Sequence, residues 1–155
     1  MVKTSKEEII WILLRISMGW IFFWAFIDKV FGLGYATEAG KSWLDGVSPT
    51  LGFLKFGTHG PLSGFYQSIA GSALVDWLFM IGLLGIGLAL IFGVFIRFAS
   101  YSGVVMMLLM WSALILPEHN PILDEHIIYG IILIGLAVTR SGRGFSLNKY
   151  FSKKK

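Results

Sequence analysis

Four stretches of this sequence are apolar over lengths that could cross a lipid bilayer, and no other feature limits the possible folds so strongly. They occupy residues 9–28, 76–96, 98–116 and 121–139. A helix needs about 20 apolar residues to cross the hydrocarbon core of a membrane. Every backbone group inside lipid must bond within the chain, so the glycines in these stretches do not argue against helix. We therefore predict an all-α integral membrane four-helix bundle, with residues 1–155 forming a single membrane domain.

The remaining composition excludes several classes of function. Only 14% of the residues are charged, well below the roughly 25% of a typical soluble domain. The chain contains no cysteine, which excludes disulfides, thiolate metal ligands and cysteine nucleophiles. No H-E-x-x-H or comparable metal-binding spacing occurs, so we predict no metal site. The basic residues flank the apolar stretches or form a short tail, which does not favour nucleic-acid binding.

The distribution of lysine and arginine predicts the orientation in the membrane. One side of the bilayer receives Lys3 and Lys6, Arg97 and the cationic tail 140–155. The opposite side receives only Lys29, Lys41 and Lys55. The pattern indicates a multi-pass protein of the plasma membrane with both termini in the cytoplasm. It also places residues 32–72 outside the cell.

The outer segment 32–72 is more than a linker. It carries apolar side chains that need an apolar environment, among them Trp43, Phe53 and Leu54. Residues 61–72 have a proline near the start and a glycine near the end, the pattern of a short helix. We therefore expect a structured cap over the outer end of the bundle.

Ionisable residues gather where the apolar stretches reach this outer boundary. Asp28 and Lys29 end the first stretch, Asp76 begins the second, and Asp124, Glu125 and His126 lie near the start of the fourth, after the Asn120-Pro121 helix-start signal. With Glu118 and His119 they would form a ring of ionisable groups at one level. His126 shares a helix face with Gly130 and Ala137, so we expect it to point inward, and we expect Glu125 to face protein or a wet cavity.

Residues 127–139 would form only about 20 Å of helix, so the charged first turns must be drawn toward the membrane. Two interpretations remain open: anchoring at the interface by mutual salt bridges, or a functional pocket in which Asp28, Lys29, Asp124, Glu125 and His126 exchange protons.

The aromatic residues Trp24, Trp77, Trp111 and Tyr129 fall just beneath this charged level. An interfacial aromatic belt would account for them without any ligand. A flat redox molecule such as a quinone would also be well served, because it needs stacking surfaces and a proton donor and acceptor for its two oxygens. Quinone is therefore the cofactor that this sequence favours.

Arg15 lies within the first apolar stretch, in its inner half. One interpretation is that its side chain extends along the helix to the inner headgroups. The other is a cation that awaits a carboxylate from a partner subunit, a lipid phosphate or an anionic ligand. We include it among the candidate cofactor-binding residues.

Three segments together resemble the DoxX/DoxD family of small four-helix membrane proteins. They are LLRISMGWIFFWAFIDKVFG (13–32), DWLFMIGLLGIGLALIFG (76–93) and NPILDEHIIYGIILIGLAV (120–138), and the loop GKSWLDGVSPTLGFLKFG (40–57) looks like the DoxD branch. The resemblance extends over roughly residues 10–145. It implies a small subunit of a thiosulfate:quinone oxidoreductase, which passes electrons to membrane quinone beside a second, DoxA-like subunit. It supplies no catalytic residues to carry over.

Two functions from different classes follow. The leading hypothesis is an integral membrane subunit of a quinone-linked oxidoreductase that takes electrons from thiosulfate or another sulfur compound. The alternative is a non-enzymatic anchor or assembly subunit for a partner redox enzyme, in which Arg15 and the small-residue faces would contact a partner or a second copy. The simpler interpretation of these faces is close helix packing within the bundle, through Gly85, Ala89 and Gly93 in the second stretch and Gly130 in the fourth. A solute carrier is less favoured, since no broken-helix signal is present.

Overall fold

The computed structural model describes residues 5–115, 120 and 122–139, and all regular structure in these residues is helical. In chain order the elements are α1 (Lys6–Phe31), the π-helical turn η1 (Phe53–Gly57), α2 (Ser63–Ser68), α3 (Ala73–Phe92), α4 (Ile96–Ala113) and α5 (Glu125–Val138). Helices α1, α3 and α4 are long and apolar enough to cross a membrane, and α5 is a shorter apolar helix. The predicted all-α membrane architecture is confirmed. The tail 140–155 lies outside the described residues, and the orientation and the plasma membrane location stay predictions.

The helices begin and end a few residues away from the predicted stretches, for local reasons. Gly93 takes the left-handed conformation and ends α3 at Phe92, and Val94 N–H bonds back to the Ala89 carbonyl. This glycine-based cap stops a helix whose apolar sequence would otherwise continue. At the other boundary, Asn120 does not start α5. Its side chain accepts from the N–H groups of Ile122 and Leu123 in a turn, and the helix begins only at Glu125.

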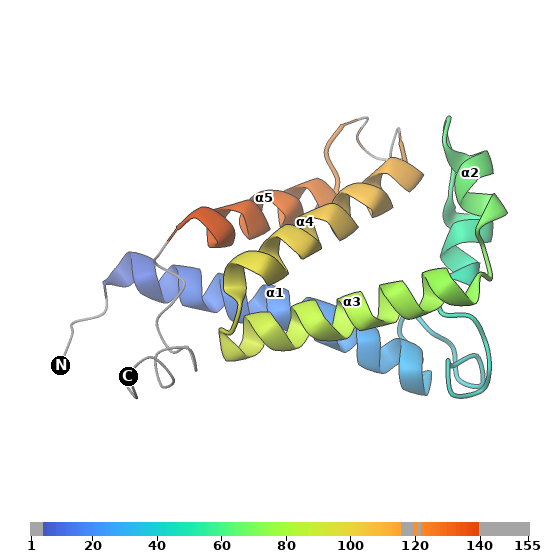
Figure 1. The fold of residues 1–155 in the computed structure, drawn as a ribbon, viewed down its shortest axis with the longest axis horizontal. Coiled ribbons are helices and arrows are strands. Elements are labelled where there is room, and N and C mark those ends of the chain that lie inside the picture. The colour runs from blue at the N-terminus through green and yellow to red at the C-terminus, as the bar shows by residue number, and fades with distance from the viewer. Residues whose placement is uncertain (1–4, 116–119, 121, 140–155) are drawn as a thin grey trace.

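Helices α1, α3, α4 and α5 form two antiparallel hairpins. Helix α1 packs against α3 and α4 packs against α5, while contacts between the hairpins are fewer. The hairpins meet near the turn that joins α3 to α4, and they diverge toward the opposite end of the bundle (Figure 1). We call that opposite end, where α1 and α4 end and α3 and α5 begin, the cap end.

Glycines set the close approaches within and between the hairpins. A Cβ atom added to Gly87 of α3 would lie 2.8 Å from the backbone nitrogen of Phe23, and one added to Gly19 would lie 2.8 Å from that of Ile91. The prediction that Gly85, Ala89 and Gly93 form the packing face of α3 is therefore wrong in part. Gly85 is exposed with nothing near its Cβ position, and the close contact with α1 is made through Gly87, half a turn further on.

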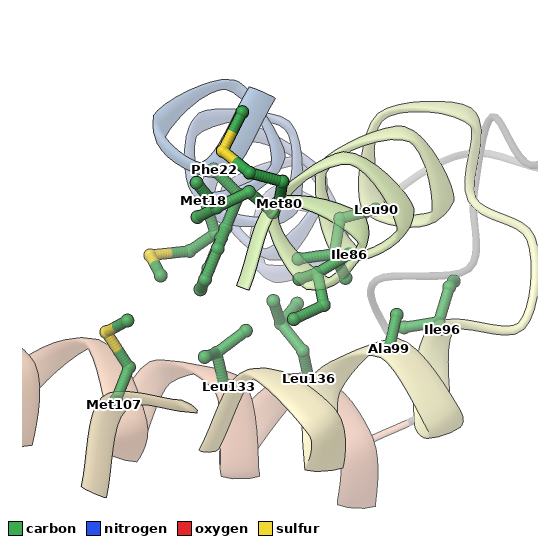
Figure 2. Close-up of a cluster of buried hydrophobic side chains, with 11 residues drawn as sticks. Met18, Phe22, Met80, Ile86, Leu90, Ile96, Ala99, Met107, Leu133 and Leu136 are labelled. Carbon is green, nitrogen blue, oxygen red and sulfur yellow. The ribbon is translucent and has the colours of Figure 1, made fainter. Parts of the chain in front are cut away.

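The core of the bundle is formed by side chains from all four helices. Met18 and Phe22 of α1 face Met107 and Leu133 across the interior (Figure 2). Lipid is as apolar as these side chains, so burying them gains little from the hydrophobic effect in a membrane. The close fit of the side chains must therefore supply most of the stabilisation.

Residues 32–72 form a structured cap at the end where the hairpins diverge, as predicted (Figure 1). The cap is attached to α1 by a hydrogen bond from Trp43 N–H to the Lys29 carbonyl, 2.8 Å long. It is attached to α4 through a small buried cluster of Leu54, Tyr66 and Ala113. The Tyr66 hydroxyl donates to the Leu109 carbonyl at 3.0 Å. The short helix predicted within residues 61–72 is confirmed as α2.

Candidate functional site

The start of α5 is organised around the Asp124 side chain. Asp124 is the N-cap residue, and its Oδ1 accepts hydrogen bonds from the N–H groups of His126 at 3.0 Å and Ile127 at 3.2 Å. These N–H groups belong to the first turn and have no partner within the helix. A carboxylate here also lies at the positive end of the helix dipole. The sequence Asp-Glu-His therefore both starts the helix and fixes the position of the histidine.

The second oxygen of Asp124 holds the His126 ring. Oδ2 lies 2.7 Å from Nδ1, and each side chain is only 9% exposed. An ionised carboxylate can only accept a hydrogen bond, so Nδ1 must carry the proton in this pair. In the neutral ring the other nitrogen, Nε2, then keeps a lone pair. Such an Asp-held histidine can accept a proton at Nε2 while the carboxylate stabilises the resulting cation.

His126 belongs to the buried face of α5, as the sequence predicted. Gly130, Leu133 and Ala137 lie on the same face, and all three are buried. Glu125 lies on another face and is exposed. Glu125 therefore does not face protein as His126 does, because successive helical residues point about 100° apart.

Asp124, Glu125 and His126 also form a group that the sequence did not predict as a metal site. One potential ligand atom from each lies within 4.8 Å of the others. Carboxylate and imidazole are ordinary ligands of divalent cations. In this geometry, however, both Asp124 oxygens already accept hydrogen bonds, and the cluster is accounted for by helix capping and by the Asp–His pair.

Asp28 and Lys29 lie at the end of α1, also at the cap end. Asp28 is 1% exposed, and its Oδ1 accepts only a long hydrogen bond, 3.4 Å, from Tyr35 N–H. Its Oδ2 is buried with no hydrogen-bond partner among the described residues. Lys29 is half-buried. The two residues are where the sequence placed them, but among the described residues no hydrogen bond or ion pair joins them to α5.

The cap takes up a further carboxylate, Asp76 in the first turn of α3. Its Oδ1 accepts from the Ser48 hydroxyl at 2.8 Å, from Thr50 N–H at 3.3 Å and from the Thr50 hydroxyl. In the part of the chain that the structure describes, the predicted ring of ionisable groups is thus three separate sites at one end of the bundle. Glu118 and His119 lie outside the described residues.

The four aromatic residues proposed to hold a quinone do not form a single platform. Trp24 contacts Trp20 and Tyr35, and Trp77 is 56% exposed and packs edge-on against Trp43. Trp111 donates from its indole N–H to the Ile122 carbonyl at 3.1 Å. Tyr129 packs against the core. Among the described residues, no ring contact joins any two of these four.

Arg15 is fully covered by protein, with 0% exposure. The interpretation that it extends through lipid to the headgroups is therefore wrong. Gly19, one turn later on α1, lies against Ile91, so the antiparallel pairing places Arg15 level with the C-terminal end of α3. That end carries the negative pole of the helix dipole, which favours a cation.

Two features of this region were missed from the sequence. The Ser48 and Thr50 partners of Asp76 lie 28 and 26 residues away, and no local pattern connects them. The only signal was a pair of hydroxyl residues around Pro49, which is also an ordinary loop composition. The short 2-residue spacing of Asp124 and His126 was visible, but the capping role of Asp124 required the start of α5 to be known.

Comparisons with known proteins assign the chain to a family. The sequence matches the DoxX family over residues 10–115, and no curated protein and no solved structure matches it. The match covers α1, the cap, α3 and α4, and it ends before the Asp124–His126 pair. It includes more than half of the 155 residues. The chain is therefore a membrane protein that belongs to the DoxX family.

Proposed function

We propose that this protein is a membrane subunit of a quinone-linked oxidoreductase, and that His126 exchanges protons with the quinone. The observation that carries the proposal is the Asp124–His126 pair at the buried start of α5. Quinone reduction needs two electrons and two protons, and a positioned histidine near neutral pH is an effective proton donor. The carboxylate of Asp124 holds the ring in one tautomer, with Nε2 available for the transfer.

The electrons must come from outside this chain's own side chains. The sequence has no cysteine, so its side chains offer no thiol redox chemistry, and the electrons come from a partner subunit or a bound cofactor. For thiosulfate as the donor, two thiosulfate ions give one tetrathionate and two electrons, and the quinone takes up these electrons with two protons to give the quinol. Lys41 and Lys55, both exposed in the cap, would attract such an anion.

The non-enzymatic alternative also has an observation in its favour. Phe56 of the cap is 79% exposed beside Lys55, and Phe65 is 61% exposed. An apolar surface of this kind on a structured cap suits a docked partner or the membrane interface. In that case the polar groups at the cap end would only attach the cap and start the helices.

A single purification separates the two functions. The protein is isolated from its membrane in mild detergent, and the organic extract is analysed by ultraviolet spectroscopy. Quinone at about one molecule per chain supports the oxidoreductase subunit. Absence of quinone, together with a stable co-purifying protein, supports the anchor and overturns the proposal. Reduction of added decyl-ubiquinone by thiosulfate, assayed in the wild type and in His126→Ala, then tests the role of the histidine, and equal rates would remove it.

A further inference from the structure

The buried glycines of the bundle are explained by close packing, with one exception. Cβ atoms added to Gly19 or Gly87 would lie within 3.0 Å of the backbone of a neighbouring helix, so these positions require glycine, and one added to Gly103 would lie 2.9 Å from a methyl carbon of Leu133. Gly130 of α5 is buried as well, yet a Cβ added there would meet nothing within 4 Å beyond its own helix backbone and adjacent residues. Glycine at position 130 therefore leaves space in the interior that no side chain fills.

This space lies directly below the histidine. Gly130 follows His126 by four residues, one helical turn, on the same buried face of α5. The Nε2 atom of His126 is the ring nitrogen that Asp124 does not hold. The unfilled space and the proton-exchanging atom thus belong to one side of one helix, within a turn of each other.

The residues opposite are suited to an adaptable apolar lining. Leu133 lies against Gly103 of α4, and the antiparallel register then places Met106 level with Gly130 and Met110 level with His126. Both methionines pack against the core. Met107 and Leu133 lie across the interior from Met18 and Phe22 (Figure 2). Methionine side chains are flexible and polarizable, and they accommodate guests of different shape.

Toward the cap end, the α4–α5 hairpin diverges from the α1–α3 hairpin (Figure 1). The cap covers the end through the Leu54, Tyr66 and Ala113 cluster. An alanine would fit at position 130 and would favour helix in this short element, so packing within the chain does not account for the glycine.

We infer that the space beside Gly130 receives the ring of a flat, apolar ligand whose oxygen bonds to His126 Nε2. The inference rests on the proposed function and moves the quinone ring from the four predicted aromatic residues to the interior between the hairpins. Gly130 is then a residue that determines which ring fits, and His126 is the residue that holds the oxygen. The chemical class is a quinone or a molecule of the same shape and polarity.

The test places a side chain in the space beside Gly130 and compares quinone binding with that of a variant changed at a matched position. The variants are Gly130→Leu and Gly130→Ala, and the control is Gly85→Leu, at an exposed glycine of α3 whose Cβ position is also open. Each full-length protein is purified in mild detergent and titrated with decyl-ubiquinone and with menadione. Binding is measured by tryptophan fluorescence quenching and by the rise in melting temperature on addition of the quinone.

We expect Gly85→Leu to bind as the wild type does, and Gly130→Leu to bind roughly tenfold or more weakly, because the leucine side chain would take the space that the quinone ring needs. Gly130→Ala should melt no lower than the wild type without quinone and should bind about threefold more weakly, in line with the loss of room for one methyl group. If Gly130→Leu does not fold, Gly130→Ala decides the question.

The outcomes distinguish this inference from the proposed function. If the wild type binds a quinone and the folded Gly130 variants bind it equally well, the function stands and the site beside Gly130 is overturned. If the wild type binds neither quinone, the proposed function fails, and the inference fails with it. Weaker binding in Gly130 variants and in Gly85→Leu alike would also overturn the site, since an exposed position would then have the same effect.

Discussion

Asp76 and Asp124 are both largely buried carboxylates at the start of an apolar helix at the cap end, but their partners differ. Asp76 accepts hydrogen bonds from the hydroxyl groups of Ser48 and Thr50 and from a backbone amide. None of these groups titrates in the physiological range. Asp124 accepts from the first backbone amides of its own helix and pairs with the imidazole of His126, a side chain that can both donate and accept a hydrogen bond through its ring nitrogens.

The difference shows that burial of an acid does not define its role. Asp76 attaches the cap, which comes from 26 to 28 residues earlier in the chain, and its contribution is to stability. Asp124 holds the His126 ring, and in the proposed function, where this ring exchanges protons, its contribution is to chemistry. The DoxX match over residues 10–115 includes Asp76 and ends before Asp124. The part of the protein assigned to a family is thus the scaffold and cap, and the candidate chemical site is beyond it.

The largest effect that tests this comparison is expected for Asp76→Ala. The change leaves the buried Thr50 hydroxyl and N–H without their acceptor, at a cost of about 3 kcal/mol in the free energy of unfolding. Thermal unfolding in detergent and limited proteolysis of residues 32–72 measure the loss. Asp76→Asn is the matched control, since its carbonyl oxygen still accepts one hydroxyl. Equal melting temperatures for all three proteins would contradict the attachment role.

His126→Gln should show the reverse pattern. Glutamine keeps a polar, hydrogen-bonding side chain at a similar length but cannot exchange a proton near neutral pH. We expect quinone reduction to fall about 100-fold, the usual contribution of a general acid or base, with little change in melting temperature. A steady-state assay with decyl-ubiquinone provides the rate. A variant with the wild-type rate, or one that unfolds, would place His126 with Asp76 as a structural residue.

The sequence predicted the features that follow from long apolar runs and local chemistry. The helices, the cap and the inward direction of His126 all depend on periodicity or on neighbouring residues, and the structure contains them. The gathering of Asp28, Asp76 and Asp124 at one end also followed from the alternating direction of the spans. These predictions need no knowledge of which segments pack together.

The contacts among those groups could not be predicted in the same way. Because the ionisable groups lie at one end of the bundle, the sequence predicted a ring of interacting charges. In the structure each acid has its partners in a different segment, as Asp76 does in the cap. One of the two interpretations of Arg15, extension to the lipid headgroups, remained open because its helix neighbours were unknown, whereas the packing of α1 on α3 covers it completely. Gly130 looked like one of many small packing residues, and only the position of α4 shows that it is not one.

A smaller effect is expected for Asp124→Asn, which separates the two roles of this residue. Asparagine is as good an N-cap as aspartate, so the start of α5 should persist. The amide no longer requires the proton on Nδ1, and we expect quinone reduction to fall about tenfold. Asp124→Ala removes the cap as well and should cost about 1 kcal/mol in stability. If Asp124→Asn destabilised the protein as much as Asp76→Ala does, the distinction between the two acids would fail.

The smallest effect is expected for Asp45→Asn. Asp45 is an exposed acid of the cap, and the pH dependence of its contribution to stability provides a reference for the buried acids Asp76 and Asp124. The hydroxyl and the N–H of Ser42 donate to Oδ2 of Asp45, at 2.6 and 3.1 Å, and these bonds hold the pKa of the carboxyl below its usual range. Ser42 itself is buried against Gly32, the residue that ends α1.

A lowered folded-state pKa means that ionised Asp45 contributes stability above its unfolded pKa of about 3.9, and that this contribution disappears as the pH falls through the folded value. Asp45→Asn should therefore melt slightly below the wild type at pH 7, and the difference should shrink as the pH falls below about 3.9. Glu38→Gln is the control, because the Glu38–Lys41 pair is exposed on both sides and is worth little. A difference that stayed constant across this range would show that the turn depends on the shape of the side chain and not on its charge, and Asp45 would then resemble neither of the buried acids.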